Sequence, residues 1–396
     1  MSTFLGLVEE IPGISVDRFD GKNLNSSAYF LSHCHTDHMR GLDYEFFEHL
    51  QQCHKYLYCS HISKVILKTK YSNIIESCVK DLAVDKKVLV NKSRDNDEKT
   101  DILFVTCISA GHCPGSVMFL FEQMDKVVLY TGDFRINPID YKKIAPLHSY
   151  QNFNKLPKEL TKMYLDTTFL DTNFAYFPTR EESINVMCKV VKNWLEKNPI
   201  NVVVLECSAL YGSEFLYIEL SKLLKTPIHI KDCVYKTYCR IQAMEHHITC
   251  DAQATSIHAC MNKFDRSGLK CRSEVLDENI LTIVPSVLKW RKKDTSVIGE
   301  WDDIKERTFN VCYSTHASYD ELKKFIQYFK PKEIHACVCS EELKHVTYRL
   351  LDDIKKEIET NENDAIRNRE TYSLQVLKRD DINKPWLNDY YSNNFL

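Results

Sequence analysis

The hexapeptide HCHTDH, which begins at His33, constrains what this chain can fold into more than any other feature of the sequence. It follows a short apolar run, Ala28–Ser32, that predicts a β-strand. Alternate side chains of an extended loop point the same way, so His33 and His35 can grip one metal ion. Asp37 and His38 can then face a second ion, because imidazole and carboxylate groups both suit Zn²⁺. The alternative is a chance cluster of polar residues on a loop.

Two later motifs supply further ligands in matching contexts. The turn GHCPG, which carries His112, lies between the predicted strands Ile102–Ser109 and Val117–Phe121. The motif YTGD closes the predicted strand Lys126–Tyr130 and places Asp133 at the edge of the sheet, where one carboxylate can bridge two ions. Open positions then remain for water, as a catalytic site requires. The predicted ligands are His33, His35, His112 and Asp133 for the first metal, and Asp37, His38 and Asp133 for the second.

The chain resembles the metallo-β-lactamase proteins that carry a β-CASP insertion, because it contains the motifs HCHTDH, GHCPGSVMFLF, YTGDFR and YLDTTF in the order found in those proteins. The opening ISVDRF beside YFLSHCHTDHMRGL is similar to the DNA nucleases of the interstrand-crosslink-repair group, and the likeness runs from about Ile14 to about Leu351. It implies an α/β fold, a metallo-β-lactamase αββα sandwich with an inserted β-CASP α/β domain. The implied parts are residues 1–169 and 308–359 for the sandwich, 170–307 for the insertion and 360–396 for a polar C-terminal tail.

The resemblance also implies catalytic roles. Asp166 matches the first β-CASP motif and could orient a metal-binding imidazole, although a carboxylate that merely caps a turn is the alternative. His316 matches the second motif and could contact the scissile phosphate, protonate the leaving oxygen or touch the second metal; otherwise it is a histidine without function near a helix N-terminus. Asp17 could support a ligand from behind or lie on the surface. The predicted catalytic residues are Asp37, Asp166, His316 and Asp17.

The residue at the family's third β-CASP motif differs between the members that cut RNA and those that cut DNA. RNA-cutting members resemble one another in carrying a histidine there, whereas DNA-cutting members carry a small apolar residue. In the stretch EIHACVCSEE the position falls on Val338 or Cys339, and His335 lies too early when the following helix is aligned. The resemblance therefore favours DNA over RNA.

A second cluster of potential metal ligands lies in the predicted insertion. A His-x-Cys pair, a later cysteine and a distant histidine can form a closed tetrahedral His₂Cys₂ site, although the spacing is not that of a standard zinc finger. The IHAC stretch, which contains His258 and Cys260, resembles the stretch of the family in which a structural zinc site is expected. The predicted ligands are His229, His258, Cys260 and Cys271, and the nearby Cys250, His246 and His247 could substitute.

The net charge of −3 argues against a globally basic nucleic-acid binder, so any DNA site must be a local basic patch. The clearest basic run is Lys289, Trp290, Arg291, Lys292 and Lys293. It could follow a DNA backbone, with the tryptophan stacked on an unpaired base. A solvated helix face is the alternative, and the same residues are a candidate nuclear-import signal.

Strands and helices alternate after the first third of the chain, which predicts a parallel α/β layer. The predicted strands cover 163–166, 201–206, 309–314 and 333–339, and the predicted helices 180–197, 213–225, 319–329 and 341–359. Residues 91–101 form a predicted charged surface loop. The N-terminus lacks the pattern of a secretory signal, and the longest apolar run is too short for a membrane span. The sixteen scattered cysteines then indicate a reducing compartment.

The sequence thus predicts a monomeric nuclear enzyme, a metal-dependent DNA exonuclease or structure-specific endonuclease that acts on ends, hairpins and overhangs. Zn²⁺ is the expected metal, and Mg²⁺ or Mn²⁺ is the alternative at the second site. End joining or crosslink repair is the implied pathway, with a DNA-dependent protein kinase and end-joining factors as implied partners. The sequence ends at Leu396 without the family's long kinase-controlled tail, which puts kinase dependence in doubt. The alternatives are an RNA-processing β-CASP nuclease, a small-molecule metallo-hydrolase and a non-catalytic scaffold.

Overall fold

The structure is a computed structural model, and it describes residues 2–91, 102–151, 153–207, 211–261 and 269–361. The predicted charged loop, apart from Asn91, and nearly all of the predicted tail lie outside the described residues. The chain divides into two compact units, Met1–Thr347 and Tyr348–Leu396. In the second unit the described residues, 348–361, are helical. None of the described helices combines the length and the apolar character that crossing a membrane would need.

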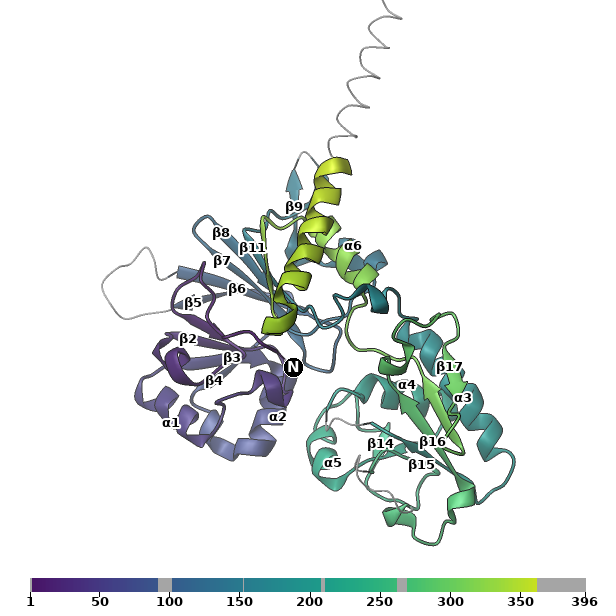
Figure 1. Ribbon diagram of the computed structural model, residues 1–396. Helices are drawn as coiled ribbons and strands as arrows, with labels where there is room; N and C mark the ends of the chain where they lie inside the picture. The colour runs from purple at the N-terminus through teal and green to yellow at the C-terminus, as the bar shows by residue number, and fades with distance from the viewer. Residues whose placement is uncertain (1, 92–101, 152, 208–210, 262–268, 362–396) are drawn as a thin grey trace, which may run out of the picture. The chain divides into compact units, whose positions relative to one another are not determined.

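The first sheet of the larger unit is parallel throughout, in the order β1-β2-β3-β4 (Figure 1). Two helices, α1 and α2, pack their buried leucine, isoleucine and phenylalanine side chains against one face of it. The elements are β1 (Ile14–Val16), β2 (Ala28–Leu31), α1 (Tyr44–Gln52), β3 (Tyr56–Ser60), α2 (His61–Tyr71) and β4 (Val79–Leu82).

The second sheet packs on the other face of the first. It runs in the order β19-β11-β8-β7-β6-β5, antiparallel from β5 to β8 and parallel from β8 to β19. Phe30 on β2 stacks edge-to-face on Phe119 and Phe121 of β7, in the core that joins the sheets. The strands are β5 (Lys87–Asn91), β6 (Ile102–Ser109), β7 (Val117–Gln123), β8 (Lys126–Tyr130), β11 (Lys162–Leu165) and β19 (Glu333–Ala336).

Helix α6 (Tyr319–Phe329) covers residues that follow β8, since Phe325 packs on Phe134 and Tyr141. A capping box of Ser318 and Glu321 explains why it begins at the predicted residue. A short hairpin of β9 (His148–Gln151) and β10 (Asn154–Pro157) precedes β11. The larger unit thus contains the predicted αββα sandwich.

The predicted insertion forms a third sheet in the order β14-β13-β15-β12-β16-β18-β17, parallel except for β17 (Figure 1). This confirms the parallel α/β layer. The strands are β12 (Val202–Leu205), β13 (Ile228–His229), β14 (Ile248–Thr249), β15 (Ile257–His258), β16 (Ile280–Pro285), β17 (Gly299–Trp301) and β18 (Thr308–Val311), and the helices α3 (Arg180–Leu195), α4 (Glu214–Leu224) and α5 (Asp232–Tyr238).

One predicted boundary is wrong. The prediction returned the chain to the sandwich at residue 308, but β18 pairs with β16 throughout its length and belongs to the sheet of the insertion. The chain leaves that sheet only after Val311. The boundary was placed from a resemblance in sequence, and strand pairing between distant segments cannot be deduced from the apolar pattern of one strand.

Candidate metal centre

The predicted ligands lie on loops that leave the strands of the sandwich at one edge. The HCHTDH loop follows β2, Asp133 follows β8 and Asp166 follows β11. Tyr130 of β8 pairs in register with Tyr164 of β11, so the two carboxylates emerge from neighbouring strand ends. The turn with His112 joins β6 to β7, and the Val117 N–H donates to the Ser32 carbonyl at 3.0 Å, which ties this turn to the HCHTDH loop.

The structure brings together the four ligands predicted for the first metal. One donor atom from each of His33, His35, His112 and Asp133 lies within 4.8 Å of the others. His35 Nδ1 is 3.1 Å from His112 Nε2, and Asp133 Oδ2 is 3.5 Å from His33 Nε2 and 3.7 Å from His112 Nε2. Tetrahedral zinc with ordinary bond lengths sets neighbouring ligand atoms roughly 3.3 Å apart. The arrangement therefore fits a zinc ion.

The electrostatics of this group also suit metal binding. Burial, followed by the charge of His33, lowers the pKa of His35 to about 3. Burial and the charge of His316 lower the pKa of His112 well below its ordinary value. Burial alone would raise the pKa of Asp133, but the His38 and His316 imidazoles hold it well below the usual range. His35 and His112 are thus kept neutral beside an ionised Asp133, the protonation state in which these three groups bind metal.

The residues predicted for the second metal surround His38. Its Nε2 atom lies 3.2 Å from Asp133 Oδ1 and 3.8 Å from Asp37 Oδ2. Asp37 also accepts a hydrogen bond from the Ser2 N–H at 3.0 Å. Among the described residues, Nε2 of His33 and Nε2 of His38 are buried and form no well-directed hydrogen bond. Such orphaned donor atoms, aimed at carboxylates, are what a metal would satisfy.

Asp17 lies behind His38 and is buried, so the alternative that places it on the surface is wrong. Its Oδ2 atom is hydrogen-bonded to His38 Nδ1 at 2.8 Å and accepts from the Tyr130 hydroxyl at 2.8 Å. Ser32 donates to Asp17 Oδ1 through its N–H, at 2.7 Å, and to Oδ2 through its hydroxyl, at 2.5 Å. Asp17 thereby fixes which nitrogen of His38 faces Asp133. Sequence reasoning missed Ser32 and Tyr130, although Ser32 directly precedes the HCHTDH motif and Tyr130 is the first residue of the YTGD motif.

We expect Asp17→Asn to weaken zinc binding at this centre by about 10- to 100-fold, the usual cost of losing a partner that orients a ligand. The amide would present two N–H donors where Ser32, Tyr130 and His38 all need an acceptor. Chelator competition on the metal-loaded protein measures the affinity. Asp20→Asn is the matched control, because Asp20 lies in the same segment and pairs with Arg18 and Arg40 near the surface. An unchanged affinity in Asp17→Asn would contradict the role.

Asp166 both caps a turn and holds a histidine, so the two interpretations offered for it are compatible. Its Oδ1 accepts from the Thr168 N–H at 2.9 Å and from the Thr168 hydroxyl at 2.6 Å. Its Oδ2 is 2.8 Å from His316 Nδ1, and His316 Nε2 lies 3.8 Å from Asp133. Burial lowers the pKa of His316, but the Asp166 and Asp133 carboxylates outweigh it and raise the pKa to about 9. The two carboxylates that flank His316 therefore favour the protonated form of its imidazole.

Val338 lies beside the first β-CASP motif. The hydroxyl of Thr167 donates to the Val338 carbonyl at 2.6 Å, and the Val338 N–H lies 3.1 Å from the same hydroxyl oxygen. His335 lies on β19, where it pairs with Tyr164 of β11, and its ring packs against the rings of Tyr164 and Phe4. Ala336 is level with Leu165 at the end of β11, so Val338 lies just beyond the strands, beside Thr167, and the histidine of this stretch packs elsewhere.

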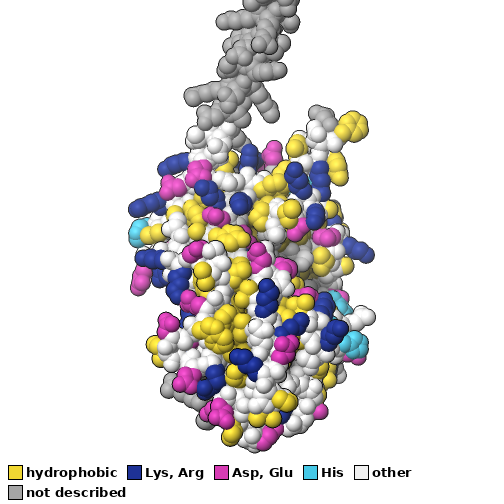
Figure 2. All heavy atoms as spheres, turned by 90° about the vertical axis from the view of Figure 1, so that its right-hand side faces the viewer, with side chains coloured by type: hydrophobic (Ala, Val, Ile, Leu, Met, Phe, Trp, Pro, Cys, Tyr) yellow, Lys and Arg dark blue, Asp and Glu magenta, His cyan; other side chains and the backbone are white. Residues whose placement is uncertain are grey.

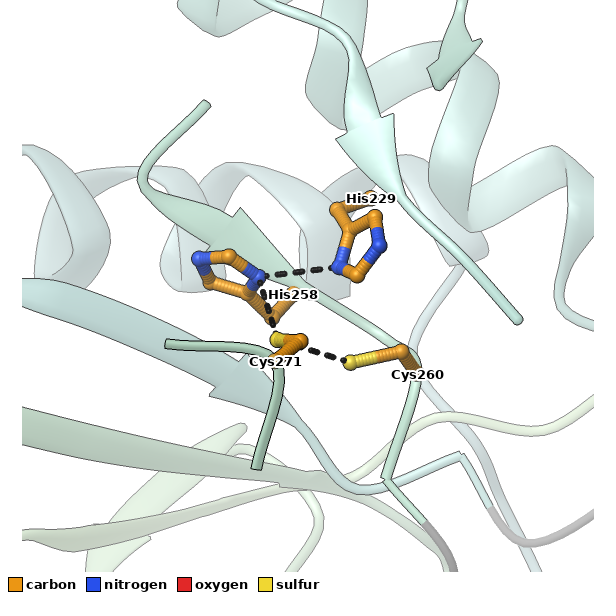
Figure 3. A group of neighbouring side chains, drawn as sticks. All are labelled: His229, His258, Cys260 and Cys271. Atoms are coloured by element: carbon orange, nitrogen blue, oxygen red, sulfur yellow. Dashed lines mark hydrogen bonds between the residues drawn. The ribbon is translucent and has the colours of Figure 1, made fainter. Parts of the chain in front are cut away.

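The four residues predicted as a second site come together in the insertion (Figure 3). Nδ1 of His229 is 3.1 Å from Nδ1 of His258, Cys271 Sγ is 3.5 Å from His258 Nδ1, and the two sulfurs of Cys260 and Cys271 are 3.4 Å apart. Tetrahedral zinc places such atoms roughly 3.3–3.8 Å apart. Burial lowers the pKa of His258 to about 4, which keeps that imidazole neutral. Cys250, which could have substituted, is exposed and is not one of the four grouped residues.

Two predictions for the basic run 289–293 are wrong: that its tryptophan stacks on a base and that it forms a helix face. Trp290 is only 1% exposed, packs with Phe169, Phe177 and Cys312, and donates its Nε1–H to a backbone carbonyl. It therefore cannot stack on a base. The run forms a short 3₁₀ turn and the residues after it, not a helix face. Three of its four cations are paired, since Lys289 contacts Asp302, Arg291 lies 3.4 Å from Asp171, and Lys293 lies 2.6 Å from Glu300. Lys292 is exposed.

Charged side chains of both signs are interspersed on the face shown in Figure 2, with lysine and arginine among aspartate and glutamate. A mixed surface of this kind gives no strong local field for a polyanion.

Comparison with known proteins finds several that are similar in sequence. A family model described as DNA repair metallo-beta-lactamase matches residues 242–342. Human protein artemis is 36% identical over 345 residues, which cover 84% of this chain and 48% of that protein. Protein artemis of Danio rerio is 36% identical over 352 residues, 85% of this chain and 53% of that protein.

A more distant relative is the DNA cross-link repair 1A protein of Gallus gallus, 28% identical over 343 residues, 82% of this chain and 32% of that protein. The chain spans about half the length of the artemis proteins it matches. Residues 242–342 thus match the DNA repair metallo-beta-lactamase family, and most of the chain is similar to protein artemis and, more distantly, to the DNA cross-link repair 1A protein.

Proposed function

We propose that this protein is a metal-dependent phosphodiesterase that cuts DNA during repair. The observation that carries the proposal is one continuous constellation: the ligand group around Asp133 and the His316–Asp166 pair that abuts it. A small-molecule metallo-hydrolase has no evident use for a second α/β domain whose flanking residues supply Asp166 and His316. A scaffold has no evident use for a full set of ligands.

Each residue has a definite role in this proposal. His33, His35, His112 and Asp133 would hold the first metal, and Asp37, His38 and Asp133 the second. Zinc, or magnesium or manganese at the second position, supplies Lewis acidity toward the phosphate and acidifies water. His316, protonated and held by Asp166, is placed to donate a proton to the departing 3′ oxygen. Asp37, whose carboxylate is partly open to solvent, is placed to orient the attacking water.

Val338 supports DNA as the substrate. The family's RNA-cutting members resemble one another in carrying a histidine at the third motif. Here that position falls on Val338 or Cys339, neither of them a histidine, and Val338 lies against Thr167 of the first β-CASP motif. The relatives' names also refer to DNA repair in the crosslink case. An RNA-processing nuclease is the alternative proposal, and it shares all the metal ligands.

Double-strand break repair by end joining, or interstrand crosslink repair, is the proposed setting. We propose that the protein acts in the nucleus as a monomer, with DNA ends, hairpins and overhangs as substrates. A DNA-dependent protein kinase and end-joining factors are proposed partners by analogy with the family. Lys289, Arg291 and Lys292 remain candidate DNA contacts, although acidic neighbours already pair with the first two.

The test is cleavage of matched labelled DNA and RNA by the purified chain. The panel contains single strands, duplexes with 5′ overhangs and a hairpin, each with and without a chelator. We expect chelator-sensitive cutting of DNA hairpins or overhangs, with RNA spared. Cutting of RNA as fast as DNA would replace the proposal by the RNA-processing alternative. Failure of metal-loaded protein to cut either polymer would overturn it.

A further inference from the structure

The imidazole of His35 has a partner on each of its two nitrogens. Nδ1 lies 3.1 Å from His112 Nε2, on the side where the ligands converge. Nε2 lies 3.1 Å from the backbone carbonyl oxygen of Tyr211. Tyr211 follows β12 and therefore belongs to the insertion, whereas His35 belongs to the sandwich. A ligand of the sandwich is thus hydrogen-bonded to the main chain of the other domain.

Because a carbonyl can only accept, this contact requires the proton to sit on Nε2 of His35. The lone pair is then on Nδ1, which is the atom that faces the other ligands. The Tyr211 carbonyl consequently sets both the tautomer of His35 and the orientation of its ring, and metal binding needs both.

Gly212 explains how that peptide group comes so near. Its φ is +114°, a conformation that side-chain-bearing residues rarely adopt. A Cβ atom built on it would lie 3.1 Å from Nε2 and 3.3 Å from Cε1 of His35. Any larger residue would therefore press on the ring, in addition to straining the turn.

Glu214 holds the turn from inside the insertion. It is the first residue of α4 and only 2% exposed, and both of its carboxylate oxygens accept the Gly212 N–H at 2.9 Å. The hydroxyl of Tyr238, at the end of α5, donates to the same carboxylate. Burial raises the pKa of Glu214 to about 7, so this carboxyl group stays in the interior at an energetic cost. Because burial of this carboxyl group costs free energy, its presence calls for an explanation, and the hydrogen bonds to Gly212 indicate that it positions the turn.

We infer that the turn Tyr211–Glu214 is a positioning element of the metal centre: Glu214 fixes Gly212, and the Tyr211 carbonyl fixes His35. The inference rests on the proposed metal centre and deepens it, because zinc affinity in the sandwich then depends on a residue of the insertion. A second hydrogen bond also runs from the insertion to a ligand loop of the sandwich. Arg180 of α3 donates to the carbonyl of Gly111 at 2.7 Å, and Gly111 directly precedes the ligand His112.

The experiment measures zinc affinity in Glu214→Ala and Glu214→Gln, in the full chain, by chelator competition. We expect Glu214→Ala to weaken zinc at the His35 centre by about 10- to 100-fold, as for other residues that orient a ligand. Glu214→Gln keeps one oxygen for the Gly212 N–H and should restore most of the affinity. Gly212→Ala should resemble Glu214→Ala by displacing the ring directly. Glu219→Ala is the matched control, because Glu219 is on the same helix and pairs with Lys222 at the surface.

Cobalt substitution separates the two metal positions. Cobalt at the His229, His258, Cys260 and Cys271 group gives a thiolate charge-transfer band, which cobalt at the nitrogen and oxygen ligands of the sandwich does not. The inference requires Glu214→Ala to change the sandwich signal and leave the thiolate band intact. Loss of both signals would mean that the insertion has come apart, and an unchanged sandwich signal would mean that the turn does not act on His35. Either result overturns the inference.

These outcomes are distinguishable from failure of the proposed function. If the wild-type chain binds cobalt only at the thiolate group, the metal centre itself is wrong and the inference falls with it. If both positions fill but no nucleic acid is cut, the function is wrong and the effect of Glu214 on affinity stands.

Discussion

Asp133→Ala is expected to empty the metal centre of the sandwich and to lower DNA cleavage by at least ~10³-fold, down to the background rate. The Asp133 carboxylate lies 3.2 Å from His38 and 3.5 Å from His33, and 3.7 Å from His112 and 3.8 Å from His316. Its two oxygens thus lie within 4 Å of four histidines of the centre. Without it the cluster consists mostly of imidazoles, which hold a second cation far less well. Several kcal/mol of transition-state stabilisation by metal correspond to the expected loss.

The measurement pairs cleavage rate with zinc content. Asp125→Ala is the matched control, since Asp125 lies at the turn before β8 and is largely exposed, with only a 3.8 Å contact to Lys126. We expect the control to keep both zinc and activity. Asp133→Ala should lose active-site zinc while the thiolate-bound zinc of the insertion remains. Chelator-sensitive cleavage at the wild-type rate by Asp133→Ala would show that this carboxylate does not hold the catalytic metal.

The sequence predicts that His33, His35, His112 and Asp133 come together, as the structure shows, because its signals are local. The HCHTDH loop directly follows an apolar strand, and Asp133 directly follows another, so the motif and its structural context are read together. The same holds for α6, whose capping box of Ser318 and Glu321 marks its first turn. In each case the residues that fix the local conformation are neighbours in the chain.

Contacts between distant segments are what the sequence does not reveal. Asp17 looks equally suited to the surface until His38, Ser32 and Tyr130 are found around its carboxylate. Trp290 sits in a basic run, but its burial depends on Phe169 and on other residues far away in the sequence. The support of His35 by Tyr211 spans 176 positions. Nothing in the pattern of one segment reports the partner that another segment will bring.

Cys271→Ser is expected to remove one zinc from the insertion and to unfold that domain at a lower temperature than the sandwich. The side chains of His229, His258, Cys260 and Cys271 come from β13, β15 and two further segments that these ligands hold together. Zinc binding to such sites contributes free energy directly to folding, on the order of 10 kcal/mol in isolated zinc fingers. A serine hydroxyl is a poor replacement for a thiolate.

Cys250→Ser decides whether the assignment of ligands is right. Cys250 directly follows β14 and is exposed, so the structure predicts that its loss changes neither zinc content nor the thermal transition. Metal analysis and calorimetry of both variants give the comparison. If Cys250→Ser lost zinc as Cys271→Ser does, the fourth ligand would be Cys250 and the group in Figure 3 would be misassigned. If neither lost zinc, the four side chains would be a hydrogen-bonded cluster, and the fold of the insertion would rest on its apolar core alone.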